Sequence, residues 1–195
     1  MKKFILTDET IEMFGVTLHR IKAVRSFGNV KEGDFGGFVE KEENISEHFE
    51  AWVYYNAIVC GDAKVYDNAK VYGNAIVCGN AKVYGNVKVY GNAIVCGGAK
   101  VYDNAKVYGN AKVCGNAKVR GNAKVYDNAD YIVFKNWWSS GRYFTWTRSN
   151  NMWSVGCFYG TGEELIKKAY QDSEKSGREY ERVVKLVQSI LEDQQ

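Results

Sequence analysis

The chain has 195 residues, with 26 Lys and Arg against 23 Asp and Glu and a formal net charge of +3. This length suits one domain or a repeat array with terminal caps. The start is not a signal peptide, because its short apolar run is interrupted at once by Asp8 and Glu9. No segment approaches the roughly 18 apolar residues that cross a bilayer. We therefore expect a cytoplasmic protein with reduced thiols and no membrane partner.

Residues 1–35 are predicted to form a small non-repetitive cap. Apolar residues at 4–6 and 17–24 suggest two short strands separated by a turn at Gly15. Ile45 and Val53 are eight residues apart whereas later valines are six apart, so residues 46–50 are expected to insert two residues at a corner. Such a segment can hide the open end of a solenoid.

Residues 36–130 are predicted to form a coil of six-residue repeats, of which NAKVYG at 68–73 is typical. With the two-residue period of a strand, Ala69 and Val71 face inward and Lys70 and Tyr72 face outward. Gly and Asn suit the bend because both tolerate positive φ. Stacked Asn amides are expected to hydrogen-bond along the axis, and Val87 alone interrupts the alanine column.

A longer period of eighteen residues lies beneath the period of six. Cys60, Cys78, Cys96 and Cys114 are each eighteen residues apart, so three repeats close one turn. The predicted fold is therefore mainly β: a three-sided, single-stranded parallel β-helix with 18 residues per turn. Thirteen repeats between Val53 and Val125 give a little over four turns and a height of roughly 20 Å.

Nearly every repeat has a small residue two positions before an inward aliphatic one. Over about 75 residues this pattern resembles that of the hexapeptide-repeat, left-handed β-helix family. This resemblance implies a left-handed coil. The chain departs from the family in carrying Tyr or Cys after the aliphatic, where a small or acidic residue is usual. GGFVEKEENIS at 36–46 and GCFYGTGEEL at 156–165, together with NAKVYG, also resemble hypothetical repeat proteins of bacteriophage and prophage genomes, a group without a settled function. That resemblance implies a viral protein in the cytoplasm of an infected or lysogenic bacterium.

The eighteen-residue period separates three sides with different chemistry. The first side is apolar, interrupted only by Lys112, and carries Ile58, Cys60, Ile76, Cys78, Ile94, Cys96 and Cys114. The second side is basic and aromatic and carries Lys64, Tyr66, Lys82, Tyr84, Lys100, Tyr102, Lys118 and Arg120. The third side has the same character and carries Lys70, Tyr72, Lys88, Tyr90, Lys106, Tyr108, Lys124 and Tyr126.

An outward stripe of Ile and Cys is expected to be covered. Either the C-terminal segment folds back over it, or it joins another copy of the chain in a homo-oligomer, a dimer or a trimer. Thiols stacked in one line cannot surround a zinc ion tetrahedrally, so no metal is expected. Adjacent cysteines lie within disulfide range, but we expect small reduced packing residues.

The lysines and tyrosines of the other two sides allow two interpretations. Cations with aromatic rings between them are typical of surfaces that bind nucleotides or single-stranded nucleic acid. Alternatively, lysine keeps the strands soluble and unpaired with foreign strands, while its stem lies across neighbouring rings. The second interpretation is preferred.

Residues 131–195 are predicted to form a small α+β domain. Strands are expected at 131–134, 143–147 and 152–158, the last two forming a hairpin. A capping box of Thr161 and Glu164 opens a helix over 162–175. Ser176 and Gly177 are expected to end it, and a second helix follows over 178–192.

Aromatic and arginine side chains are concentrated in this C-terminal domain. The group consists of Trp137, Trp138, Arg142, Trp146, Arg148 and Trp153. Such residues are typical interface anchors and also typical core of a small sheet, and we assign about half of them to the core.

The sequence offers no arrangement of catalytic residues. Related hexapeptide-repeat acyltransferases use a histidine in the coil and a loop between rungs, whereas His19 and His48 precede the regular coil and no loop interrupts residues 57–128. Cys157 is expected in a strand without a nearby base. No enzyme activity and no cofactor are therefore predicted.

Three functions remain. The first is a phage-encoded interaction protein whose rigid coil binds a host protein, for example to inhibit an antiphage defence protein. The second is a module that binds nucleotides or nucleic acid through the Lys and Tyr side chains. The third is a structural or assembly protein.

Overall fold

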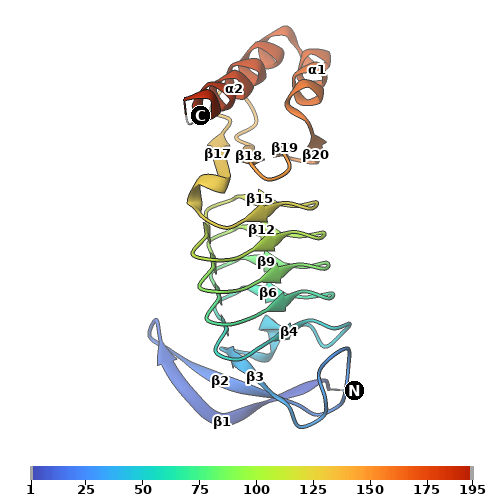
Figure 1. Cartoon of the computed structure of the whole chain (residues 1–195), viewed down its shortest axis with the longest axis vertical. Coiled ribbons are helices and arrows are strands. Elements are labelled where there is room, and N and C mark those ends of the chain that lie inside the picture. Colours follow the sequence, from blue (N-terminus) through green and yellow to red (C-terminus); the bar gives the residue numbers. More distant parts are fainter. Residues whose placement is uncertain (1, 194–195) are drawn as a thin grey trace.

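A computed structural model describes residues 2–193 of the chain. An N-terminal hairpin, a coil of short strands and a C-terminal α+β unit follow one another along the long axis (Figure 1). The hairpin consists of β1 (Phe4–Met13) and β2 (Val16–Ala23), which are longer than predicted and are paired with a register shift between Leu6 and Thr10.

The coil begins with β3 (Phe35–Val39) and contains one two-residue strand in each repeat. These strands are β4 (Trp52–Val53), β5 (Ile58–Val59), β6 (Lys64–Val65), β7 (Lys70–Val71), β8 (Ile76–Val77), β9 (Lys82–Val83), β10 (Lys88–Val89), β11 (Ile94–Val95), β12 (Lys100–Val101), β13 (Lys106–Val107), β14 (Lys112–Val113), β15 (Lys118–Val119) and β16 (Lys124–Val125). They form three parallel sheets, β3-β5-β8-β11-β14, β6-β9-β12-β15 and β4-β7-β10-β13-β16, the first of which β2 and β1 extend. The three-sided coil is confirmed, and it has about 5 turns.

The interior of the coil is a stack of like residues. The inward valines and alanines of the repeats are 0% exposed, and Val87 is enclosed as completely as the alanines above and below it. Each valine stacks in register on valines of the neighbouring rungs, as Val77 does on Val59 and Val95. Burial of one such side chain contributes about 1.5–3 kcal/mol, so the columns stabilise an otherwise thin structure.

The corners are held by side-chain amides and by positive φ angles. Asn68, Asn86 and Asn104 form one amide ladder, with N···O distances of 3.1 and 3.2 Å, which confirms the predicted stacking. Asp67 and Asp103 replace the usual corner glycine at φ 57° and 64°. Their carboxylates accept the N–H groups of Gly85 and Gly121 on the next rung, at 3.1 Å each, so the two acids join adjacent turns.

In the coil, backbone N–H groups donate to carbonyls of the following rung, as the N–H of Lys64 does to Ala81 at 2.9 Å. The carbonyls of the first rung therefore receive no N–H from a preceding rung and need other donors. The Lys3 ammonium donates to the carbonyls of Ser46 and Ala51. The amide of Asn44 likewise donates to the carbonyls of Gly61 and Ala63, at 3.0 and 2.9 Å. Lys3 is fully enclosed, and this burial lowers its pKa to about 8.

The last rung has the opposite problem, since its N–H groups lack a following carbonyl. Side-chain oxygens of the next segment accept them. The backbone N–H of Lys112 donates to Asn128 Oδ1 at 2.9 Å, that of Lys118 to Thr145 Oγ1 at 2.9 Å and that of Lys124 to Ser149 Oγ at 2.6 Å. Both ends of the coil are therefore closed by polar side chains that satisfy backbone groups.

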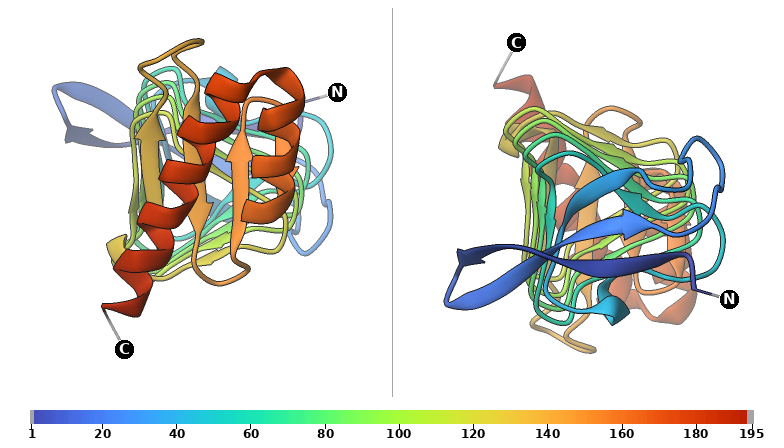
Figure 2. Two further views of the ribbon diagram at one scale, coloured as in Figure 1. Left: turned by 90° about the horizontal axis from the view of Figure 1, so that it is seen from above. Right: turned by 90° about the horizontal axis from the view of Figure 1, so that it is seen from below.

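The C-terminal unit stands on the last rung. An antiparallel sheet contains β17 (Tyr131–Lys135), β18 (Tyr143–Thr147), β19 (Met152–Val155) and β20 (Phe158–Gly160). Helices α1 (Gly162–Asp172) and α2 (Glu174–Glu192) lie across its outer face (Figure 2). Short 3₁₀ helices occupy Glu42–Asn44 and Asn128–Asp130.

The third predicted strand and the break between the helices are corrected by the structure. A turn at Gly156, with φ 58°, divides the strand expected over 152–158, so Cys157 lies in an exposed turn. The helices are separated at Ser173, whose hydroxyl accepts the N–H of Ser176 at 3.1 Å. Gly177 lies inside α2, where a Cβ would be 2.2 Å from the Tyr170 ring. This glycine therefore permits close helix packing rather than a helix end.

No helix within residues 2–193 is long and apolar enough to cross a membrane.

Candidate binding faces of the solenoid

The first side carries the predicted apolar stripe, which consists of Ile58, Cys60, Ile76, Cys78, Ile94, Cys96 and Cys114. Ile58 and Cys60 are each 5% exposed, and the remaining members are half-buried. The hairpin supplies the cover, because its apolar side chains pack around the lower stripe. These side chains are Ile11, Met13, Val16 and Leu18.

This cover differs from both of the expected ones. The C-terminal unit lies at the end of the coil and does not fold back over the stripe (Figure 1). Instead, β2 pairs with β3 and so extends the sheet that carries the stripe. The alternating apolar residues of the hairpin were the signal that the sequence interpretation missed. Association of two copies through the upper stripe stays a prediction.

The cysteines of the stripe fall into two pairs. Cys96 and Cys114 form a disulfide, with Cα atoms 4.6 Å apart, so the expectation of reduced thiols is wrong for this pair. Adjacent rungs bring the two Cα atoms to a separation that a disulfide can bridge. Cys60 and Cys78 are free, and burial, with Cys78 alongside, raises the pKa of Cys60 to about 11. Residues 2–193 contain no group of three side chains that could hold a metal ion.

On the second side, tyrosines form a continuous ring stack. The centroids of Tyr66 and Tyr84 are 4.7 Å apart and those of Tyr84 and Tyr102 are 5.0 Å apart, with interplanar angles of 6°. Burial and the neighbouring rings raise the pKa of Tyr84 to about 12. Because each ring face is covered by the next ring, this ladder stabilises the coil and leaves little aromatic surface for a base.

Arg120 ends the same ladder where the C-terminal unit begins. Its guanidinium lies 4.8 Å from the Tyr102 ring and 4.6 Å from the Tyr159 ring, and it pairs with Asp103 at 3.3 Å. The Tyr159 hydroxyl lies 3.3 Å from the Arg120 carbonyl, to which it donates. The single Arg in the tyrosine column therefore marks the junction between the coil and its cap.

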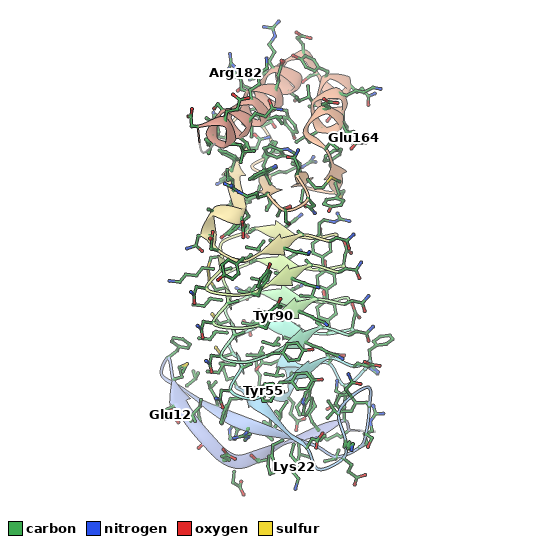
Figure 3. The ribbon with its side chains drawn as sticks, in the orientation of Figure 1. Glu12, Lys22, Tyr55, Tyr90, Glu164 and Arg182 are labelled. Atoms are coloured by element: carbon green, nitrogen blue, oxygen red, sulfur yellow. A yellow bond between two sulfur atoms is a disulfide. The ribbon has the colours of Figure 1, made fainter. Side chains whose placement is uncertain are left out.

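On the third side, the ladder is interrupted. The ring centroids of Tyr54 and Tyr72 are 4.7 Å apart and those of Tyr90 and Tyr108 are 5.0 Å apart. Between these two pairs the ladder is broken, because the described rings of Tyr72 and Tyr90 do not stack on each other. A groove of about 330 Å³ lies at this interruption, lined by Tyr72, Tyr90, Lys88 and Lys106. Tyr90 lies midway along the coil (Figure 3). Tyr126 at the end of the ladder is tilted by 60° against Tyr108.

The outward lysines differ in how much they are already engaged. Lys70 pairs with Glu50 at 3.7 Å. Lys118 is half-buried and donates to the Gly156 carbonyl at 3.0 Å, and burial beside Lys100, itself half-buried, lowers its pKa. Five lysines of the second and third sides are exposed and form no ion pair with any described residue. We call these five the lysine columns: Lys64, Lys82, Lys88, Lys106 and Lys124.

The C-terminal aromatic group does not form one surface. Trp146 and Trp153 are each 2% exposed and lie in the core of the unit, against which Trp138 packs. Trp137 is 75% exposed, and Arg142 and Arg148 are also at the surface. The two histidines precede the coil's lysine columns in sequence: His19 lies on β2, and His48 is an exposed residue of the loop at 46–50.

Three parallel sheets built from six-residue repeats define a β-solenoid repeat protein. Within it, residues 63–79 match the YdcK beta solenoid repeat family. The matched residues run from Ala63 through β6, β7 and β8, nearly one full turn, so the repeat is of the YdcK type over that turn. A search of curated proteins finds no match to the chain.

Proposed function

We propose that this protein is a non-enzymatic interaction protein whose solenoid presents the lysine columns to an acidic surface of another protein. The observation that carries this proposal is the set of exposed lysines without carboxylate partners on two adjacent sides of a rigid coil. Lys88 stacks in register on Lys106, and Lys106 on Lys124. Like charges one strand spacing apart, about 4.8 Å, repel one another, and a bound acidic surface relieves that repulsion.

The tyrosine ladders support a protein partner over stacked bases. The rings of Tyr66, Tyr84 and Tyr102 cover one another, so they offer an edge and a hydroxyl row rather than open ring faces. Such a surface is flat and rigid, and binding to it costs little ordering entropy.

The resemblance to bacteriophage repeat proteins supports a more specific proposal. The segments at 36–46 and 156–165 carry that resemblance. We infer that the partner is a bacterial host protein that the phage inhibits, such as one acting in antiphage defence.

A capture experiment tests the proposal. The tagged protein is incubated with lysate of phage-infected bacteria, with and without nuclease, beside a variant with Lys88, Lys106 and Lys124 changed to Glu. A charge-matched control changes Lys167 and Lys168 on α1 and Lys175 on α2, which are also exposed, to Glu. The wild type and the control should retain the same nuclease-resistant protein and the column variant should lose it. Equal retention by all three contradicts the proposal.

Nucleotide or nucleic-acid binding is the second candidate, and the groove between Tyr72 and Tyr90 favours it. A base inserted there would stack on two rings while Lys88 and Lys106 contact its phosphates. Loss of the captured material on nuclease treatment would support this candidate. Capture of nothing, together with a defined homo-oligomer by light scattering, would instead support a structural role.

A further inference from the structure

We propose that the C-terminal unit binds a small uncharged molecule, an apolar ring that carries a carbonyl oxygen, independently of the lysine columns. The site is a cavity of about 320 Å³ between the sheet and the helix pair, a size typical of small-molecule sites. Its apolar wall is formed by Trp146, Trp153, Val184, Val187 and Leu191.

The first sign of a missing acceptor is the indole of Trp153. This residue is 2% exposed and lines the cavity, and its N–H has no acceptor among the described residues. The neighbouring Trp146 differs, because its indole N–H donates to Asn151 Oδ1 at 2.8 Å. The Trp153 N–H is therefore the indole donor that the cavity wall leaves open to a ligand, and an oxygen placed beside it would accept a hydrogen bond.

The second sign is the start of the 11-residue helix α1. Thr161 Oγ1 accepts the N–H of Glu164, but the N–H groups of Gly162 and Glu163 have no acceptor among the described residues. Both residues line the cavity. A Cβ on Gly162 would lie 3.3 Å from Trp153 Nε1, which places the helix start beside the unpaired indole. The unpaired indole and the two unpaired N–H groups of the helix start therefore belong to residues that line the same cavity.

The cavity has an acidic residue and no basic one among its described lining residues, which favours an uncharged ligand over an anion. None of the described residues that line the cavity is Lys, Arg or His, whereas Glu163 is one of them. The Glu164 carboxylate accepts the N–H of Thr161 at 2.8 Å at the same helix start (Figure 3). These two acids offset the positive end of the helix dipole, so a carbonyl oxygen fits better than a carboxylate.

The test uses three probes of similar shape on the full chain labelled with ¹⁵N. Benzamide carries a neutral carbonyl, benzoate carries a charge and toluene carries no acceptor. Benzamide should shift the Trp153 indole and Gly162 amide resonances saturably, with a dissociation constant at least about tenfold below those of benzoate and toluene. Absence of a saturable benzamide shift, or equal binding of benzoate, would overturn the proposal.

Two variants locate the site. Trp153→Phe removes the N–H and keeps a ring, so benzamide should bind about tenfold more weakly while toluene is unaffected. Should this variant lose its dispersed spectrum, Gly162→Ala serves instead, because its Cβ would lie 2.8 Å from Val184 Cγ1 and narrow the cavity. Unchanged benzamide binding in a folded variant of either kind overturns the proposal.

Discussion

The side chains of the solenoid and those of the C-terminal unit find their packing and hydrogen-bond partners in different ways. In the solenoid, most residues meet their own kind on the next rung, as valine does on valine, asparagine on asparagine and tyrosine on tyrosine. In the C-terminal unit the contacts do not repeat, and at the cavity an indole and two helix N–H groups have no acceptor among the described residues. Repetition therefore produces extended columns suited to a broad charged partner, whereas the unique segment produces a cavity suited to a small one.

The largest expected effect is a charge placed in the interior column. Val89→Asp puts a carboxylate at a position that is 0% exposed, and we expect a loss of more than about 4 kcal/mol, since no partner is within the column. Lys88→Asp, one residue earlier and exposed, is the control and should change stability by less than about 1 kcal/mol. Urea unfolding followed by circular dichroism measures both, and equal midpoints would contradict the stacked interior.

Opening the Cys96–Cys114 disulfide should have the next largest effect. It closes a loop of 18 residues, which corresponds to about 3 kcal/mol in the chain-entropy account. Cys114→Ala should lower the urea midpoint under oxidising conditions and make the protein insensitive to dithiothreitol. Cys157→Ser, at a free and exposed thiol, should do neither. A wild-type midpoint that dithiothreitol leaves unchanged would contradict this role.

The helix pair should respond to a single methyl group. Gly177→Ala places a Cβ 2.2 Å from the Tyr170 ring and should cost about 1–3 kcal/mol through overpacking, despite the better helix propensity of alanine. Thermal unfolding measures the loss, with Ser176→Ala as a neighbouring control. Tyr170→Ala removes the ring that the new Cβ meets, so Gly177→Ala should destabilise the protein less in that background. An equal loss of stability with Tyr or Ala at position 170 would exclude the clash as its cause.

The tyrosine ladders predict a smaller, pH-dependent effect. Burial raises the pKa of Tyr54 and Tyr84 to about 12, above the unfolded value of about 10. The folded state therefore holds these protons more tightly, and stability is fully present below pH 10 and is lost as the pH rises to 12. Urea midpoints measured across this range should fall, and Tyr84→Phe should fall less steeply. An identical slope in the variant would show that the ladder does not titrate this way.

The repeat was predictable because its physics is local. Alternation within Ala69-Lys70-Val71 gives the inward face, and the eighteen-residue spacing of Cys60 and Cys78 gives three sides without knowledge of distant contacts. The same spacing predicted the tyrosine and lysine columns. It could not reveal the interruption between Tyr72 and Tyr90, since their two repeats differ only at an inward position, Ala69 against Val87, and the tyrosines point outward.

The ends were harder because they depend on contacts between distant residues. Lys3 meets the carbonyl of Ala51, and the hairpin covers Ile58, yet no local pattern links those segments. Gly177 was taken as a helix breaker because a glycine that permits close packing and one that ends a helix look alike in sequence. The C-terminal cavity likewise arises from Gly162 and Trp153, which come together only in the folded unit.

The most direct test of the central claim is the salt dependence of binding to the captured host protein. Affinity of the wild type and of the control changed at Lys167, Lys168 and Lys175 should fall steeply between about 50 and 200 mM NaCl, because exposed charges are screened over this range. The variant with Lys88, Lys106 and Lys124 changed to Glu should bind weakly with little salt dependence. Equal affinities and equal slopes for this variant and the wild type would contradict a binding surface made of the lysine columns.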